Sequence, residues 1–143
     1  MTDNISKSER SEVMKKVRSI SKMEEEVRKA LWKKGIRFRK NVKKLVGKPD
    51  IAISKYKIVI FIDSCFWHAC PLHGRRPKSN TDFWNKKLDR NKQRDQEVNL
   101  HYLERGWHVR RVWEHELKAD FDGVIDDLAA FITSQKNLQA SRL

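Results

Sequence analysis

The sequence predicts a single α/β domain, built on a small central mixed sheet with helices on either side. Its length of 143 residues allows one hydrophobic core. Residues 57–62 (KIVIFI) are almost wholly apolar and β-branched, which is typical of a strand covered on both faces. Residues 107–113 (WHVRRVW) alternate and predict a second buried strand, and segments with helical periodicity precede and follow these strands.

The N-terminal segment is expected to be helical after a loose start. Residues 1–10 are polar and show no apolar periodicity. An amphipathic helix begins near Ser11 and breaks around 19–21. Ser21 can cap a second helix, which stops at Gly35.

Three short strands are predicted next. Residues 36–44 alternate apolar and basic side chains, which favours an edge strand. A Gly-Lys-Pro turn at 47–49 then leads into a short strand over 50–53. A second turn at 55–56 joins this strand to the apolar strand 57–62 as a hairpin.

The C-terminal half is expected to contain two helices with a strand between them. A long helix starts in the run Ser-Asn-Thr-Asp at 79–82 and ends at Gly106, where strand 107–113 begins. A last helix covers about 122–133, with apolar residues on its inner face. The chain is thereby divided into a flexible basic N-terminal arm or helix (1–20), the main domain (21–133) and a polar tail (134–143).

Charge indicates the class of partner. Lysine and arginine outnumber the acidic residues by 32 to 19, a net charge of +13. Such a surplus attracts polyanions, so nucleic acid is the favoured partner. An anionic membrane is disfavoured, because the sequence shows no spanning apolar stretch and no secretory leader; a basic surface that merely keeps the protein in solution is the alternative. With two cysteines, a disulfide framework is not expected, and we expect a cytoplasmic protein.

Two aspartates lie at the ends of neighbouring predicted strands. Asp50 follows Pro49 and opens one strand, and Asp63 closes the next, so a hairpin would place the two carboxylates side by side. Such a pair can share a hard cation, usually Mg²⁺. The layout resembles the PD-(D/E)xK nucleases, but Cys65 stands where they have a lysine, and His68 is the nearest group that could activate a water. The alternative is that Asp50 is only a turn acid.

A zinc site is predicted beside these acids. Cys65, Cys70 and His73 have C-x₄-C-x₂-H spacing, and His115 directly follows the last strand. Two thiolates and two imidazoles suit a closed, tetrahedral, structural Zn²⁺ site. His68 is excluded as a ligand because four donors are already available. The alternative is two buried cysteines and two surface histidines.

Aromatic and basic residues predict contacts with DNA. Phe66 with Trp67, and Phe83 with Trp84, are adjacent pairs that could insert between base steps; the alternative is packing in the core. A basic stretch with few acids favours phosphate contact over a merely solvated helix face. Its members are Arg75, Arg76, Lys78, Lys86, Lys87, Arg90, Lys92 and Arg94.

Several motifs occur together between about residues 10 and 117. They are Gly47-Lys48-Pro49-Asp50, Val59-Ile60-Phe61, Cys65-Phe66-Trp67-His68, Pro77 through Trp84, Arg90-Asn91 with Arg94-Asp95, Gly106-Trp107 and Val112-Trp113-Glu114. In this set the sequence resembles the very-short-patch repair (Vsr) DNA mismatch endonucleases. The resemblance implies a PD-(D/E)xK restriction-endonuclease-like fold for the main domain and a Mg²⁺-dependent nick 5′ of the thymine in a T:G mismatch. It also implies work beside a cytosine-5 DNA methyltransferase.

The resemblance also implies roles for single residues. Asp50 matches the metal-binding aspartate and His68 the catalytic base. Glu24 matches a helix glutamate that supports this chemistry, with Glu25 as the fallback register. The zinc positions match with permuted ligand types. Residues implied to contact DNA are Phe66, Trp67, Trp84, Lys87, Asn91, Arg75, Arg76 and Lys78.

Two positions depart from the best-known pattern of the family. Asp63 replaces a second active-site histidine, so it could bind the metal directly. Ile62 replaces a threonine whose backbone carbonyl touches the metal, and a carbonyl survives that change. The first hypothesis is therefore a mismatch-directed nicking endonuclease that acts as a monomer on DNA. The others are a related nuclease of a restriction–modification system with a different site, and a zinc-stabilised DNA-binding module without catalysis.

Overall fold

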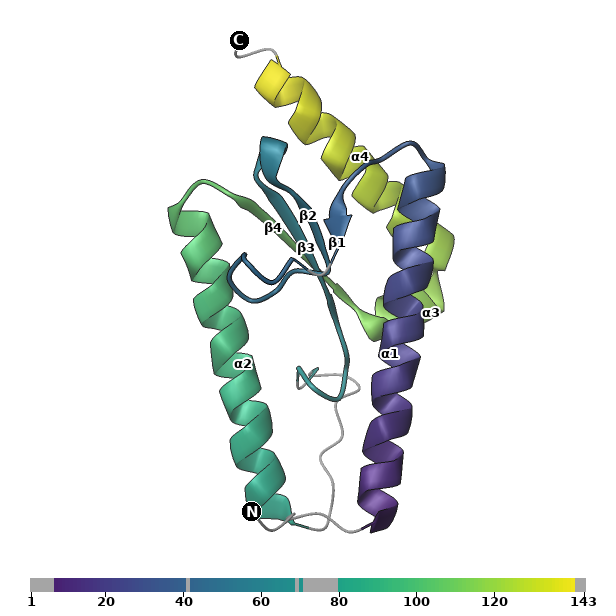
Figure 1. Ribbon diagram of the computed structural model, residues 1–143, viewed down its shortest axis with the longest axis vertical. Helices are drawn as coiled ribbons and strands as arrows, with labels where there is room; N and C mark the ends of the chain where they lie inside the picture. The colour runs from purple at the N-terminus through teal and green to yellow at the C-terminus, as the bar shows by residue number, and fades with distance from the viewer. Residues whose placement is uncertain (1–6, 41, 69, 71–79, 141–143) are drawn as a thin grey trace.

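A mixed sheet of four strands lies between helices on both of its faces in the computed structural model (Figure 1). The structure describes residues 7–40, 42–68, 70 and 80–140. The strand order is β1-β2-β3-β4; β1, β2 and β3 pair antiparallel, and β3 pairs parallel with β4. The elements are α1 (Lys7–Lys33), β1 (Arg39–Lys40), β2 (Ile51–Ile53), the 3₁₀ turn η1 (Ser54–Tyr56), β3 (Ile58–Asp63), α2 (Thr81–Glu104), β4 (His108–Trp113), α3 (Glu114–Ala119) and α4 (Phe121–Ala140).

Strand β3 is buried along its whole length, because helices cover both of its faces. Its side chains alternate between two apolar clusters. Ile58, Ile60 and Ile62 pack with residues of α1, α3 and α4. Val59 and Phe61 pack on the other face with residues of α2. The predicted small α/β domain with a mixed sheet flanked by helices is confirmed.

Helix α1 is continuous through residues 19–21, so the predicted break there is wrong. These three residues include no proline or glycine, and Ile20 and Met23 pack against the core on either side of Ser21. Packing of an apolar face stabilises a helix more than the intrinsic preference of a single serine weakens it.

The later elements also differ from the prediction in extent. Among the described residues of the predicted edge strand 36–44, only the two of β1 lie in a strand. Helix α4 continues to Ala140, and its last turn contacts η1 through a hydrogen bond from Gln139 Nε2 to the backbone carbonyl of Tyr56 at 2.7 Å. Strand β4 is half-buried rather than buried, with Val112 its one fully buried residue.

Residues 64–68, which we call the segment after β3, lie between the two long helices. In Figure 1, the N-terminal halves of α1 and α2 extend past the end of the sheet on either side of this segment. Lys16 of α1 lies 4.8 Å from the ring centroid of Phe66, and Asn91 of α2 donates to the carbonyl of Trp67 at 3.2 Å. Among the described helices, none combines the length and the apolar character that crossing a bilayer requires.

Gly47, in the turn that leads to Asp50, should resist substitution more than Gly35. Both have positive φ, +76° and +86°, so alanine strains either turn. A Cβ on Gly47 would also lie 2.7 Å from Cγ1 of Val98, whereas nothing lies within 4 Å of one on Gly35. Gly47→Ala should therefore cost about 1–3 kcal/mol more than Gly35→Ala in urea unfolding. Equal costs would mean that the close approach of α2 to this turn is not formed.

Candidate active site

The β2–β3 hairpin brings Asp50 beside the end of β3. Ile51 pairs with Ile60 across the hairpin, as the predicted turn at 55–56 requires. The backbone N–H of Ile62 donates to Oδ2 of Asp50 at 2.7 Å, which orients that carboxylate. Burial raises the pKa of Asp50; this hydrogen bond and the charges of Arg28 and His68 oppose the rise, while the charge of Asp63 adds to it.

Helix α1 places Glu24 against Asp50. Burial, followed by the charge of Asp50 and a hydrogen bond with it, raises the pKa of Glu24 to about 7. Glu25, the fallback of the sequence analysis, instead accepts a hydrogen bond from Nη2 of Arg28 at 3.1 Å. The carboxyl groups of Glu24 and Asp50 are therefore in contact, and ionising both at once is costly.

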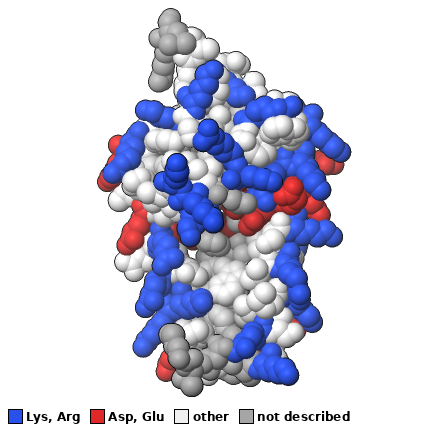
Figure 2. Space-filling model, viewed as in Figure 1, with Lys and Arg blue, Asp and Glu red and all other residues white. Residues whose placement is uncertain are grey.

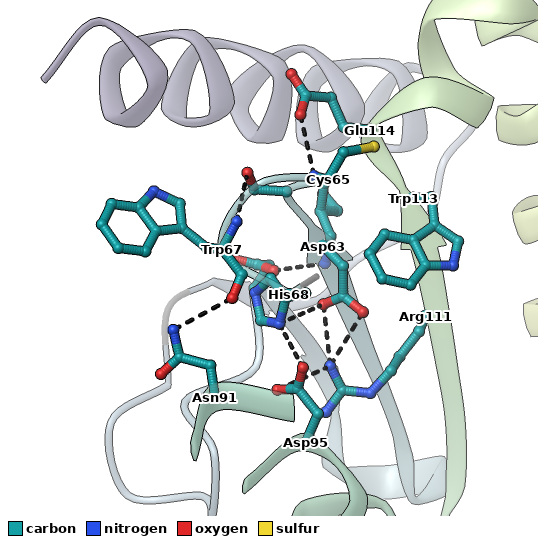
Figure 3. A network of polar contacts seen from close by, with 12 residues as sticks. Asp63, Cys65, Trp67, His68, Asn91, Asp95, Arg111, Trp113 and Glu114 are labelled. Carbon is teal, nitrogen blue, oxygen red and sulfur yellow. Dashed lines mark hydrogen bonds and ion pairs between the residues drawn. The ribbon is translucent and has the colours of Figure 1, made fainter. Parts of the chain in front are cut away.

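His68 lies in a second group of polar side chains at the end of β3 (Figure 3). Its Nδ1 lies 2.5 Å from Oδ2 of Asp95, which comes from α2, and 3.7 Å from Oδ1 of Asp63. Nη1 of Arg111, on β4, lies 2.9 and 3.2 Å from the two oxygens of Asp63 and 3.7 Å from Oδ1 of Asp95. Nε of Arg111 donates to Oδ1 of Asn99 at 2.6 Å, so the guanidinium is held from two sides.

This arrangement makes His68 a stronger base than a free imidazole, because its pKa is raised. Burial opposes the charge, but the hydrogen bond to Asp95 and the charge of Asp63 outweigh it and raise the pKa of His68. Burial also raises the pKa of Asp63, and the charges of His68 and Arg111 only partly offset the rise.

Three of the four predicted zinc ligands lie together. Nδ1 of His115 is 3.4 Å from Sγ of Cys65 and 3.5 Å from Sγ of Cys70. Tetrahedral ligands with Zn–S of about 2.3 Å and Zn–N of about 2.0 Å lie about 3.5 Å apart, so the spacing fits. His73, the predicted fourth ligand, lies outside the described residues. The predicted DNA contacts Arg75, Arg76 and Lys78 also lie outside them.

The predicted aromatic wedge is mostly packed inside the molecule. Phe66 and Trp84 are buried, with their ring centroids 5.4 Å apart, while Trp67 is half-buried. Lys87 Nζ lies 5.3 Å from the ring centroid of Trp67. Trp67, Lys87 and Asn91 thus lie next to each other where α2 meets the segment after β3.

Two residues of the network were not assigned roles from the sequence. Asp95 belongs to the Arg94-Asp95 motif, but nothing in the sequence of this basic helix indicates that its side chain faces His68. Arg111 lies in an alternating strand, where its direction depends on register; the pairing of Asp63 with Trp113 sets that register.

Comparisons with known proteins identify the family. The family model described as DNA mismatch endonuclease Vsr matches residues 2–73. The type II nicking enzyme V.NmeAIP of Neisseria meningitidis serogroup A / serotype 4A is 50% identical over 121 residues, covering 82% of this chain and 86% of that protein. V.NaeI of Lentzea aerocolonigenes is 46% identical over 117 residues, covering 78% and 70%. The DNA mismatch endonuclease Vsr of Escherichia coli K12 is 34% identical over 121 residues, covering 82% and 77%.

The chain belongs to the Vsr family. As a Vsr-family protein it is an endonuclease, and its relatives support a DNA-nicking activity. The described residues of this Vsr-family chain hold two groups able to bind a metal ion, which are Cys65 with Cys70 and His115, and Asp63 with His68 and Asp95.

The metal-free protein should lose stability as pH rises from about 4 to 8. Because the pKa values of Glu24, Asp50, Asp63 and His68 are raised, the folded state binds more protons than the unfolded chain over this range. Glu24→Gln should remove the part of this loss that lies between pH 4.5 and about 7. Urea midpoints in EDTA at several pH values measure it, with the exposed Glu26→Gln on the same helix as control. An unchanged pH dependence in Glu24→Gln would contradict the contact with Asp50.

Proposed function

We propose that this protein is a Mg²⁺-dependent endonuclease that nicks double-stranded DNA at T:G mismatches, 5′ of the mismatched thymine. The observation that supports it most is the convergence of Asp50, Glu24 and the His68–Asp95 pair at one end of the sheet. In Figure 2 a band of acidic side chains crosses this face, and lysines and arginines line both sides of the paler surface beneath it. We also propose that the fold is PD-(D/E)xK-like, and that the protein acts as a monomer beside a cytosine-5 DNA methyltransferase.

The residues around Asp50 fit a divalent cation. Two half-buried carboxylates in contact hold their protons more tightly than usual, because no adjacent charge fully compensates them. We assign Mg²⁺ to Asp50 and the carbonyl oxygen of Ile62. When bound, Mg²⁺ would neutralise charge that develops on the phosphate. Asp63 suits this role less well, because both of its oxygens already face Arg111.

His68 is the proposed general base. With Nδ1 turned to Asp95, Nε2 remains to accept a proton from the attacking water. Asp95 holds the ring in this orientation and stabilises the imidazolium that results. Glu24, which contacts Asp50, would help to hold the same water or the cation.

A structural Zn²⁺ ion is proposed for Cys65, Cys70 and His115, with His73 as the fourth ligand. Its function would be to hold the segment that presents His68 and Trp67. Trp67, Lys87 and Asn91 would contact DNA directly, and Phe66 and Trp84 would support Trp67 or insert beside the mismatch after a rearrangement.

A nicking enzyme of a restriction–modification system, with another site or lesion, is the second candidate. The observation that favours it is the higher identity to relatives named type II nicking enzymes, 50% and 46%, than to the E. coli Vsr protein, 34%.

A panel of labelled duplexes tests the proposal. With Mg²⁺, we expect a single nick in the T:G duplex and none in the matched duplex or with EDTA. Asp50→Ala should bind the T:G duplex but not nick it. A nick at a different mispair or in matched DNA would favour the second candidate, and no nick in any duplex would favour a non-catalytic DNA-binding module.

His68→Ala should lower the single-turnover nicking rate by about 10² to 10⁴, the usual loss for a general base. Asp95→Asn should lower it less, since the imidazole remains but its orientation is weakened. Binding of the T:G duplex should be unchanged in both. Wild-type rates in His68→Ala would remove the imidazole from the mechanism.

Arg111 should be required because it compensates buried Asp63. Arg111→Met leaves that carboxylate uncompensated, at a cost of about 3–5 kcal/mol in unfolding free energy, and weakens nicking. The double variant Asp63→Asn with Arg111→Met should recover much of the stability. Arg110→Met is the matched control, because Arg110 is exposed and stacks on Phe131 on the opposite face of β4. Additive losses in the double variant would contradict the pairing.

A further inference from the structure

A cavity of about 600 Å³ lies beside the active-site carboxylates, between the C-terminal half of α1 and the region of β1. None of the proposed catalytic or zinc-binding residues lines it. Its walls combine four basic residues, two aromatic residues and one acid. They are Arg28, Lys29, Lys33, Lys40, Trp32, Phe38 and Glu25.

Arg28 is the buried cation of this cavity. Only 7% of the residue is exposed, and Nη2 is used by Glu25 at 3.1 Å. Within the part of the chain that the structure describes, Nε and Nη1 find no hydrogen-bond acceptor. Donors of a buried charged group are seldom left without partners, because losing their hydration is costly. Arg28 is therefore suited to receive an anion from outside the protein.

Trp32 provides an exposed aromatic surface at the same place. The residue is 50% exposed and belongs to neither apolar cluster, so core packing does not explain it. The guanidinium of Arg37 stacks 3.8 Å from its ring centroid, and Phe38 meets it edge-on at 5.8 Å. Nη1 of Arg37 also donates to the carbonyl of Trp32 at 3.0 Å, which holds this stack in place.

The charges favour an anionic occupant. Lys29, Lys33 and Lys40 are exposed at the cavity. The single acid, Glu25, is already paired with Arg28. Glu24 lies one helical turn before Arg28 on α1 and next to Glu25 of the cavity wall, so the cavity adjoins the proposed cleavage site; the charge of Arg28 accordingly lowers the pKa of Glu24 and of Asp50. Aromatic rings beside cations are the usual surface for an unstacked nucleotide, which offers a flat base and a phosphate.

We propose that this cavity binds one nucleotide of the DNA substrate next to the scissile phosphate. The base lies against Trp32 and Phe38, and the phosphate is bound by Arg28 and the neighbouring lysines. The proposal rests on the proposed function, because it takes the DNA strand from the carboxylates as its source. An acidic protein segment or a second copy of this chain would use the lysines but not the flat aromatic surface.

Duplex binding tests the cavity without requiring cleavage. In EDTA, Trp32→Ala should weaken binding of the T:G duplex about ten- to a hundredfold, which is the usual loss of one stacked base, and Trp32→Tyr should retain most of it. Lys33→Glu should make binding less dependent on salt, because one phosphate contact is lost. Leu103→Ala is the control: Leu103 is 61% exposed on α2, away from the cavity, and its substitution should change nothing. Unchanged affinity and salt dependence in both cavity variants would overturn the proposal.

Photo-crosslinking identifies the occupant. Duplexes with 5-iododeoxyuridine at single positions on either side of the nick should crosslink to the peptide containing Trp32–Phe38 at one position only, and Trp32→Ala should abolish that crosslink. Crosslinks only to other peptides, or a dimer formed through this face, would overturn the proposal. If the wild-type protein nicks no duplex but still crosslinks here, the proposed function fails and the nucleotide cavity stands.

Discussion

Burial of β3 on both faces is the constraint on which the site depends. Helices α1, α3 and α4 cover one face of this apolar strand, and α2 covers the other. Polar groups from both sides can therefore meet only at the end of the strand, beyond the apolar layers. Asp63 follows the alternation of Val59 and Phe61 and meets α2, where Asp95 lies. Asp50 is held to the same strand end by the N–H of Ile62. The core that stabilises the fold thus also sets the relative positions of the proposed catalytic groups.

The polar groups at this end divide into two parts with different electrostatics. Glu24 and Asp50 form a carboxylate pair in which burial and mutual repulsion raise both pKa values, so a bound cation would compensate them. His68, Asp95, Asp63 and Arg111 form a network in which each carboxylate contacts a positive or protonatable group. The first part suits metal binding and the second suits proton transfer. The two parts still influence each other, because the charges of Asp63 and His68 act on the pKa of Asp50.

The predicted zinc site connects the proton-transfer part to the rest of the fold. Cys65 and Cys70 flank His68 in sequence, and His115 belongs to α3 beyond the end of β4. The backbone N–H of Cys65 also donates to Oε1 of Glu114 at 3.1 Å. These contacts attach the segment after β3 to the start of α3. They limit how far this segment can move away from Asp95 and from the aromatic residues of α2.

Local sequence patterns determined much of this protein. Periodicity and spacing, which act between near neighbours, predict the apolar strand 57–62 and the turn at 55–56 that joins it to the strand before it. They also predict the long helix ending at Gly106 and the residues of metal-ligand type. The tertiary structure alone decided that Asp95 meets His68 and that Arg111 compensates Asp63. It also places Glu24, the residue that the resemblance implies, rather than Glu25 against Asp50. It also decided that α1 is unbroken and that Phe66 and Trp84 are buried. These outcomes depend on how α1 and α2 rotate and pack against the sheet, and that packing energy is shared among residues far apart in the chain.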